Sequence, residues 1–444
     1  MDRELICKIL NSEMGLATGC TEPAAIALCA AYAREALAGD VAEIAVRASI
    51  NIIKNAMAAG IPGCSYTGVA YAAALGAIAG QTQRQLQAID HATEEERKAA
   101  EELVAAGRVF LERKDTTEAL YIEIELHSRS GHRAKAIIAS THANLVYLQA
   151  DDEVRVDHPI GTRVKGVPAD RIDAALSIGS IYEFVNGIDR NKDDLNIIDR
   201  AISVNMRISQ EGENQTFNLH VGQNIAAMRH SGLYANDVVV RAMEAAACGI
   251  DARMGGANVP VVTNSGSGNQ GITATVPIVV AADMWRIDED RRFRAVTLSH
   301  LICIYIHCRF GLLSSLCGAT IAATGVTCGL VYLMGGGCVE LERAVNNMIG
   351  GVAGMLCDGA KADCALKVAT CVNSAFICAS MAMAGVGVQP NEGIVEKDAA
   401  KTVTNFVRLG NDGSPVMDSI VLDIMLNKGT MDACETPEIR FCFV

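Results

Sequence analysis

Apolar residues recur at every second position in two short segments of the first third of the chain. Positions 44, 46, 48 and 50 are Ile, Val, Ala and Ile, and positions 120, 122, 124 and 126 are Leu, Ile, Ile and Leu. A period of two residues is typical of a strand with one buried face. Two further apolar segments follow at 133–140 and 144–149, and Ser130-Gly131 lies where a hairpin turn is expected. The pattern predicts a small, mainly antiparallel sheet.

Most of the remaining chain has the helical period. Residues 3–13 place Leu5, Ile6, Ile9 and Leu10 on one face, and Pro23 suits the first turn of a helix that ends near residue 38. Helices are also expected at 67–79 and in the charged segment after residue 93. From residue 168 onward the pattern is almost only helical, interrupted by Pro and Gly. We therefore expect an α+β fold, mostly α, with a mixed α+β region at 1–165 and a large all-helical domain at 166–444.

Three stretches carry no formal charge: 254–282, 310–339 and 368–391. A membrane span needs about 20 consecutive apolar residues. However, the first stretch contains the polar loop NSGSGNQG and two prolines, and the second is rich in Gly, Ser and Thr. Buried helices explain these stretches better than membrane spans. The N-terminal segment also lacks the long apolar run of an export signal, so we expect a cytoplasmic protein without a membrane partner.

Composition and net charge exclude some classes of protein. Half of the residues are apolar and 20% are charged, which excludes a disordered chain. The formal net charge of −13 argues against nucleic acid as a partner, because phosphate binding needs clustered Lys and Arg. Apolar helices with few charges favour a homo-oligomer. Sixteen cysteines remain to be explained, and in a cytoplasmic protein they serve packing, metal ligation or catalysis.

The cysteine spacing excludes several common sites. No two cysteines stand three positions apart, so zinc ribbons, ferredoxin-type clusters and thioredoxin-like sites lack their usual pattern. Cysteines recur every seven residues from Cys357 to Cys378, but seven residues of helix rise about 10.5 Å, too far for one small metal centre. The Asp-Gly pair after Cys357 predicts a turn that folds it over the first turn of the helix carrying Cys364. A third ligand must come from elsewhere, and Cys317 beside Gly318 is a candidate. On spacing alone, core packing is the favoured interpretation of each of these thiols.

Five motifs are distributed along the chain: GCTEPAAIAL at 19–28, NIIKNA at 51–56, NSGSGNQG at 264–271, CGATIAATG at 317–325 and CDGAKADC at 357–364. Together they resemble one family, the iron–sulfur-dependent L-cysteine desulfidases, which are related to the alpha chain of iron–sulfur L-serine dehydratases. The resemblance covers the whole chain and implies a [4Fe–4S] cluster on Cys317, Cys357 and Cys364, with Cys20 as catalytic acid/base. Compared with the serine dehydratases, the last two ligands are closer in sequence and GCTEP replaces a Ser-His-Thr type loop. Both differences favour the desulfidase.

The implied reaction is the α,β-elimination of L-cysteine to sulfide, pyruvate and ammonia. Three thiolates leave one iron of the cluster open as a Lewis acid, whereas a fourth would close it. L-serine dehydratase, by the same mechanism, is the alternative. A non-enzymatic small-molecule binding protein or membrane carrier is the alternative of another class. A pyridoxal phosphate enzyme would need a Schiff-base lysine, and no motif nominates one.

Two loops are expected to contact the amino-acid substrate. Cys20 precedes a helix N-terminus, which stabilises a thiolate, whereas Glu22 reads as a cap or an ion-pair partner. The Gly- and Ser-rich loop before the helix predicted from Gly271 suits a substrate carboxylate. The expected substrate-binding residues are Thr21, Asn264, Ser265, Gly266, Ser267, Gly268, Asn269 and Gln270.

For several other lysine, histidine and cysteine side chains, the sequence does not decide between a role in chemistry and a structural role. Lys54 and Lys361 stand inside motifs and could contact substrate or be surface cations. His300 and His307 share a helix face and are expected to serve packing. The tail cysteines Cys434 and Cys442 are undecided between packing and capping the open iron.

Overall fold

The computed structural model describes residues 2–62, 66–161, 166–310 and 314–427. The chain forms two compact units. The sheet unit comprises Ala17–Lys165, Asp358–Lys361 and Pro415–Val444, and the helical unit comprises Met1–Leu16, Gly166–Cys357 and Ala362–Ser414. Residues 1–16 therefore group with the helices, whereas the sequence placed them with the sheet. The α+β class, mostly α, is confirmed.

The sheet unit contains one six-stranded sheet, ordered β3-β2-β4-β5-β6-β7. Its strands are β2 (Val41–Ala48), β3 (Val109–Arg113), β4 (Tyr121–Ser128), β5 (Arg133–Ala139), β6 (Leu145–Ala150) and β7 (Glu153–Asp157). Strands β2 and β3 are parallel and the other neighbours are antiparallel, so the mainly antiparallel sheet is confirmed. Its helices are α2 (Thr21–Ala36), α3 (Ile50–Ala56), α4 (Val69–Ala79), α5 (Glu94–Ala105) and the 3₁₀ helix η1 (Thr82–Gln87).

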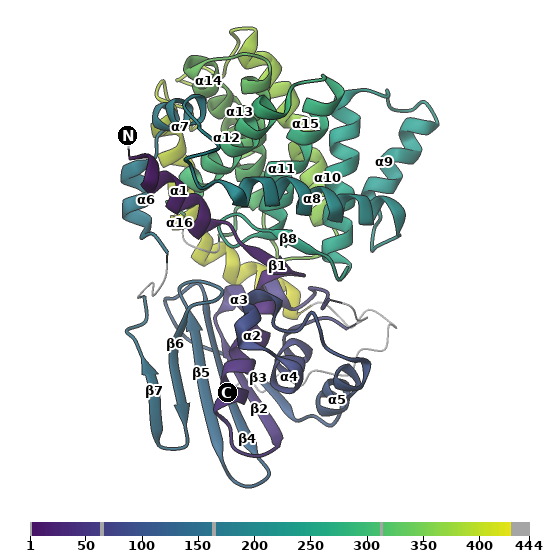
Figure 1. The fold of residues 1–444 in the computed structure, drawn as a ribbon, viewed down its shortest axis with the longest axis vertical. Coiled ribbons are helices and arrows are strands. Elements are labelled where there is room, and N and C mark those ends of the chain that lie inside the picture. The colour runs from purple at the N-terminus through teal and green to yellow at the C-terminus, as the bar shows by residue number, and fades with distance from the viewer. Residues whose placement is uncertain (1, 63–65, 162–165, 311–313, 428–444) are drawn as a thin grey trace. The chain divides into compact units, whose positions relative to one another are not determined.

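The two faces of this sheet differ as the alternation predicts. Ile122, Ile124 and Leu126 on β4 are fully buried, and α2 and α4 pack against the sheet (Figure 1). On the opposite face, the Arg47 guanidinium donates hydrogen bonds to the carboxylates of Glu112 and Glu123, both at 2.8 Å. One face of the sheet therefore belongs to the core and the other carries a charge network.

The helical unit contains α1 and most of the chain from α6 onward. Its helices are α1 (Arg3–Glu13), α6 (Ala169–Ala175), α7 (Ile178–Asn186), α8 (Asn196–Asn214), α9 (Val221–His230), α10 (Val238–Met254), α11 (Gly268–Met284), α12 (Glu289–His307), α13 (Gly318–Leu333), α14 (Cys338–Val352) and α15 (Cys364–Met383). Helix α16 (Ala399–Leu426) begins here and ends in the sheet unit. One short strand, β8 (Pro260–Val262), departs from the all-helical expectation. The chain passes from this unit into the sheet unit within the short strand β1 (Leu16–Thr18).

The uncharged stretch 310–339 corresponds mainly to α13, a buried helix. A Cβ atom on Gly325 would lie 2.5 Å from the carbonyl oxygen of Ser299, and one on Gly329 would lie 2.4 Å from Ile278. These glycines let α11 and α12 approach the backbone of α13. Among the described residues, one helix, α15, is long and apolar enough to cross a membrane, and half of its apolar window is buried. A core helix has the same length and composition.

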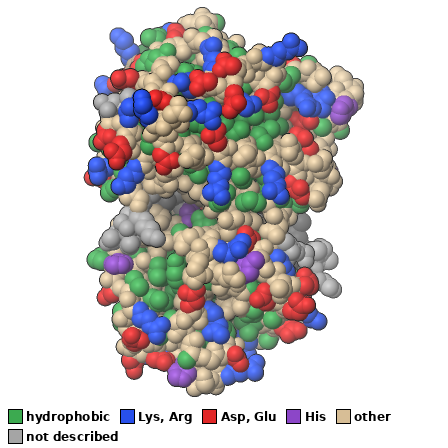
Figure 2. Space-filling view, viewed as in Figure 1, with side chains coloured by type: hydrophobic (Ala, Val, Ile, Leu, Met, Phe, Trp, Pro, Cys, Tyr) green, Lys and Arg blue, Asp and Glu red, His purple; other side chains and the backbone are tan. Residues whose placement is uncertain are grey.

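The exposed surface carries charges of both signs. On the face drawn in Figure 2, Lys and Arg side chains are interspersed with Asp and Glu. A nucleic-acid interface would instead need a continuous basic patch. This face therefore offers no such patch.

Candidate functional site

Cys317 and Cys357, two of the predicted cluster ligands, are brought together by a short antiparallel bridge in the helical unit. Leu316 and Leu356 pair across it. The backbone N–H of Cys317 donates to the carbonyl of Met355 at 2.8 Å, and that of Cys357 donates to the carbonyl of Ser315 at 2.7 Å. The bridge aligns the two cysteines although forty residues separate them in sequence.

The third predicted ligand, Cys364, is the first residue of α15, and Cys317 is the N-cap of α13. A helix N-terminus carries a partial positive charge and stabilises a nearby thiolate. Both thiols therefore lie where the backbone favours the ionised form. The turn predicted at Asp358-Gly359 is present, since Gly359 has a φ of 103°.

The thiols of this trio influence one another. The hydrogen bond with the Cys357 thiol raises the pKa of Cys317, burial raises it further, and Cys364 is close enough to add to the effect. Ionising the three thiols together therefore needs a bound cation. Among the described residues, no three Cys, His, Asp or Glu side chains converge closely enough to hold a single metal ion. The ligand role of these cysteines stays a prediction.

The other cysteines of α13 and α15 fit the packing interpretation. Cys328 and Cys371 are fully buried, and burial raises the pKa of Cys371 to about 12. Cys378 is buried as well. A thiol with so high a pKa is a small hydrophobic side chain rather than a nucleophile. The tail residues Cys434 and Cys442 lie outside the described residues.

The predicted substrate loop forms a tight turn between β8 and α11. Asn264 and Ser267 exchange backbone hydrogen bonds of 3.0 and 2.9 Å. Between them, Ser265 has a φ of 47° and Gly266 a φ of 80°, the signature of a type I′ turn. The left-handed conformation is costly for a serine, and such strain concentrates at functional sites.

Helix α11 begins at Gly268, three residues before the predicted start. Ser267 caps it, because its hydroxyl oxygen accepts a hydrogen bond from the backbone N–H of Gln270 at 3.3 Å. Gly271 is required for packing, since a Cβ atom there would lie 2.0 Å from the carbonyl oxygen of Val262. The loop and the first turn of α11 therefore form one close-packed element.

Arg253, a residue that the sequence analysis missed, holds this loop from α10. Its side chain is 3% exposed, and its Nη1 donates to the side-chain oxygen of Asn269 at 2.7 Å. A Cβ atom on Gly268 would lie 2.3 Å from the Arg253 Nε. No carboxylate pairs with Arg253 among the described residues. Only the fold brings this positive charge to the loop, so no local sequence pattern could have found it.

Cys20, the predicted acid/base, belongs to the sheet unit. It is the N-cap of α2 and is 1% exposed. Gly19 before it has a φ of 71°, and a Cβ atom there would lie 2.5 Å from the Pro62 ring. Only glycine fits this turn, which sets the position of Cys20 at the helix N-terminus.

Replacing Gly19 by alanine should destabilise the sheet unit by about 1–3 kcal/mol, because a side chain there is both strained and overlapped by Pro62. Thermal unfolding of the variant would measure the loss. Gly15→Ala is the matched control, since nothing lies within 4 Å of a Cβ atom there. Equal stability of both variants would show that the Gly19 turn adapts to a side chain.

Glu22 is a buried ion-pair and hydrogen-bond partner, one of the two roles expected for it. Its Oε2 accepts from the Thr21 hydroxyl at 3.1 Å, its Oε1 accepts from Asn55 at 3.0 Å, and His142 lies 3.9 Å away. Burial alone would raise its pKa, but His142 and Asn55 outweigh burial and lower the pKa to about 2. The carboxylate therefore remains ionised at neutral pH and ties α2 to α3.

Glu22→Gln should lower the free energy of unfolding by about 1–3 kcal/mol at pH 7. The folded pKa is below the unfolded value of 4.5, so this stabilisation is complete above pH 4.5 and is lost as pH falls towards 2. Denaturant unfolding of wild type and variant at several pH values between 7 and 3 should show the difference shrinking. Glu102→Gln, on the exposed face of α5, is the control. A pH-independent difference would contradict the assignment.

The two motif lysines have different surroundings. Lys54 is not a surface cation: it is 1% exposed, and its Nζ lies 2.5 Å from the carboxylate of Asp418. Lys361 pairs with Asp358. Lys54 is therefore part of a buried ion pair within the sheet unit.

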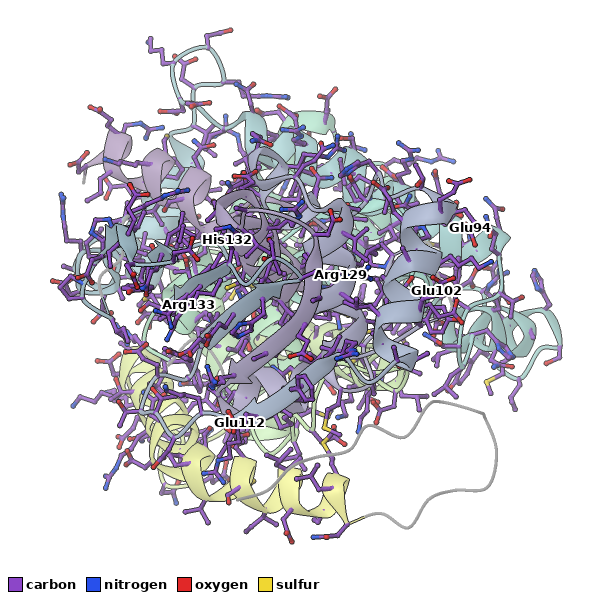
Figure 3. The ribbon with its side chains drawn as sticks, turned by 90° about the horizontal axis from the view of Figure 1, so that it is seen from below. Glu94, Glu102, Glu112, Arg129, His132 and Arg133 are labelled. Carbon is purple, nitrogen blue, oxygen red and sulfur yellow. The ribbon has the colours of Figure 1, made fainter. Side chains whose placement is uncertain are left out.

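A cavity of about 650 Å³ also lies in the sheet unit. It is lined by small apolar residues and by charges of both signs, among them Arg34, Glu102 and Arg129. Figure 3 shows Glu102 on α5 and Arg129 at the β4–β5 hairpin. None of the predicted catalytic, substrate-binding or metal-binding residues lines it, so it is separate from the candidate site.

Known proteins resemble this chain over most of its length. The pattern of the family described as serine dehydratase alpha chain matches residues 83–423. A UPF0597 protein of Oleidesulfovibrio alaskensis is 40% identical over 420 residues, 95% of this chain and 97% of the relative. UPF0597 proteins of Clostridium perfringens (427 residues) and Bacteroides thetaiotaomicron (439 residues) are both 39% identical, and each alignment covers 96% of this chain and 99% of the relative. The similarity therefore covers both units.

Proposed function

Since this chain belongs to the serine dehydratase alpha chain family, whose name supports a lyase-type role, we propose that it is an iron–sulfur-dependent L-cysteine desulfidase. The reaction would be α,β-elimination of L-cysteine to sulfide, pyruvate and ammonia. The observation that carries the proposal is the convergence of Cys317, Cys357 and Cys364 in the helical unit.

These three thiols fit a [4Fe–4S] cluster. The Cys317 thiol hydrogen-bonds with the Cys357 thiol, Cys364 is close enough to influence it, and Cys317 and Cys364 stand at helix N-termini, which favour thiolates. When bound, a cluster on three thiolates supplies one iron with an open position, a Lewis acid for the substrate carboxylate and the departing sulfur. Cys317, Cys357 and Cys364 would hold it, and the surrounding buried helices would exclude water.

The loop at 264–271 would bind the substrate carboxylate. The first turn of α11 directs backbone N–H groups outward, and Arg253 adds a buried positive charge beside Gly268 and Asn269. Asn264 and Gln270, predicted as direct donors, already donate to His300 and to Asn264, respectively. The backbone and Arg253 are therefore better candidates for the carboxylate than these two amides.

Cys20 would move the proton of the substrate Cα. As a thiolate at the N-terminus of α2 it would accept that proton while the Cβ–S bond breaks, and the resulting thiol could return it to a product. The backbone dipole of α2 favours the thiolate form before the transfer. The Gly19 turn would hold the sulfur at the helix end.

L-serine dehydratase is the second candidate function. The family match favours it, because elimination of hydroxide needs the same groups. The GCTEP loop and the short spacing of Cys357 and Cys364 favour the desulfidase. The two activities differ only in the leaving group, so a direct comparison of substrates decides between them.

The proposal is tested by purifying the chain without oxygen, reconstituting it with iron and sulfide, and assaying L-cysteine and L-serine in parallel. We expect sulfide and pyruvate in equal amounts from L-cysteine, with a higher kcat/KM than for L-serine. A higher kcat/KM for L-serine would make the chain a dehydratase. Binding of either amino acid without turnover would instead support a binding protein. The cytoplasmic location and homo-oligomeric state stay predictions.

A further inference from the structure

Arg97 on α5 is a buried cation of the sheet unit. It is 8% exposed, and in the part of the chain that the structure describes no carboxylate forms an ion pair with it. Its Nε donates to the carbonyl oxygen of Ala92 at 3.2 Å, and its Nη1 donates to that of Pro62 at 2.7 Å. A buried charge is costly unless hydrogen bonds compensate it, so these two carbonyl groups stabilise the guanidinium inside the unit.

The bond to Pro62 depends on the shape of the arginine side chain. A guanidinium is planar and presents its N–H groups in a fixed fork, so it donates to two carbonyl oxygens at once. Ala92 lies just before α5, whereas Pro62 lies in the segment between α3 and α4. Arg97 therefore connects the start of α5 to that segment.

The ring of Pro62 lies against the turn that precedes Cys20. A Cβ atom on Gly19 would lie 2.5 Å from the Pro62 Cγ and 2.8 Å from its Cδ. Pro62 is itself buried, so its ring has little room to move away. Its carbonyl oxygen contacts Arg97 and its ring contacts Gly19, so two contacts connect the guanidinium to the residue before Cys20.

The same turn is also held at Thr18, the residue before Gly19. Thr18 is 4% exposed, and its hydroxyl oxygen accepts a hydrogen bond from Gln87 Nε2 at 3.1 Å. After the turn, α2 begins at Thr21 with Cys20 as its N-cap. The turn therefore has one support at Thr18 and a second at Gly19, and the second depends on Arg97.

We propose that Arg97 is a positioning residue for Cys20: through Pro62 it holds the Gly19 turn, and with it the Cys20 sulfur, at the N-terminus of α2. Arg97 is not a catalytic residue, because its donors bond to the backbone. A displacement of about 1 Å at a reacting group lowers the rate by up to about a hundredfold. The effect on catalysis rests on the proposed function, whereas the placement of the turn rests on these contacts alone.

The placement is tested by amide hydrogen exchange of the full-length chain, purified without added iron. In Arg97→Met, the peptide that contains residues 17–24 should exchange about tenfold faster than in the wild type, because the turn opens more often. Arg97→Lys should give a smaller increase, since an ammonium group lacks the fork, and it decides the test if Arg97→Met does not fold. Unchanged exchange of this peptide in a folded variant would overturn the inference.

Arg34→Met is the matched control. Arg34 lies at the opposite end of α2, where its Nη1 donates to the carbonyl oxygen of Leu37 at 3.1 Å. Its loss removes the same kind of bond from the same helix, but it should leave exchange at residues 17–24 unchanged. Equally fast exchange in Arg34→Met would show that any loosening of α2 reaches Cys20, and would overturn a specific role for Arg97.

The effect on catalysis is tested by a double-mutant cycle with the reconstituted chain. Arg97→Lys should lower kcat for L-cysteine about tenfold, with KM within about twofold and iron content unchanged. In a Cys20→Ala background, Arg97→Lys should cause no further loss, because the group that it positions is gone. Equal losses in both backgrounds would make Arg97 a general structural residue. If the wild type turns over neither L-cysteine nor L-serine, the proposed function fails, while hydrogen exchange still supports or overturns the placement of the turn.

Discussion

Cys317→Ala should lower sulfide release from L-cysteine at least about a thousandfold, an increase of about 4 kcal/mol in the activation free energy. The thiol of Cys317 is the one that the bridge at Leu316–Leu356 places beside Cys357, so its loss leaves two of three predicted ligands. Iron and acid-labile sulfide should fall in parallel with activity after anaerobic reconstitution. Cys357→Ala and Cys364→Ala should behave alike.

Cys328→Ala is the matched control for this prediction. Cys328 is a fully buried thiol on α13, the helix for which Cys317 is the N-cap, and its role is packing. The variant should lose about 1 kcal/mol of stability but keep its iron and its turnover. If Cys328→Ala lost as much iron as Cys317→Ala, the effect would reflect packing of α13 rather than ligation.

Cys20→Ala should lower kcat by about a hundredfold to ten-thousandfold, the range for removing a general acid/base. Unlike Cys317→Ala, it should retain the iron and sulfide content of the wild type, because Cys20 belongs to the sheet unit and is not among the predicted ligands. Steady-state kinetics together with iron analysis of the same preparation would separate these two effects.

Cys29→Ala tests whether any thiol of α2 would give that result. Cys29 is fully buried on the same helix, and its thiol donates to the carbonyl of Ala136 at 3.4 Å. Its variant should keep kcat within about threefold, since the hydrogen bond is structural. Near-wild-type turnover in Cys20→Ala would assign the proton transfer to another group.

The sheet could be predicted where local alternation is strong, and not elsewhere. The apolar positions of β4 at 122, 124 and 126 are all buried, as a period of two requires. Strands β3 and β7 were missed because both are only five residues long and mostly exposed. The parallel pairing of β2 with β3 joins segments separated by three α-helices and η1, and no local pattern specifies it.

In the candidate site, too, local sequence patterns predicted some residues, whereas others are brought together only by the fold. The cysteine motifs and the substrate loop could be nominated because their residues are close in sequence or shared with a family. Arg253 could not, because it lies on α10 and meets the loop only in the folded unit. His300 was expected to serve packing; it is buried, but its two ring nitrogens each have a specific hydrogen-bond partner.

The most direct measurement of the central claim combines iron content with turnover in one anaerobic preparation. The full-length wild type, reconstituted with iron and sulfide, should bind about four irons per chain and release sulfide and pyruvate from L-cysteine. Cys317→Ala, prepared in parallel, should do neither. A wild type that binds no iron, or a Cys317→Ala variant as active as the wild type, would contradict the cluster mechanism.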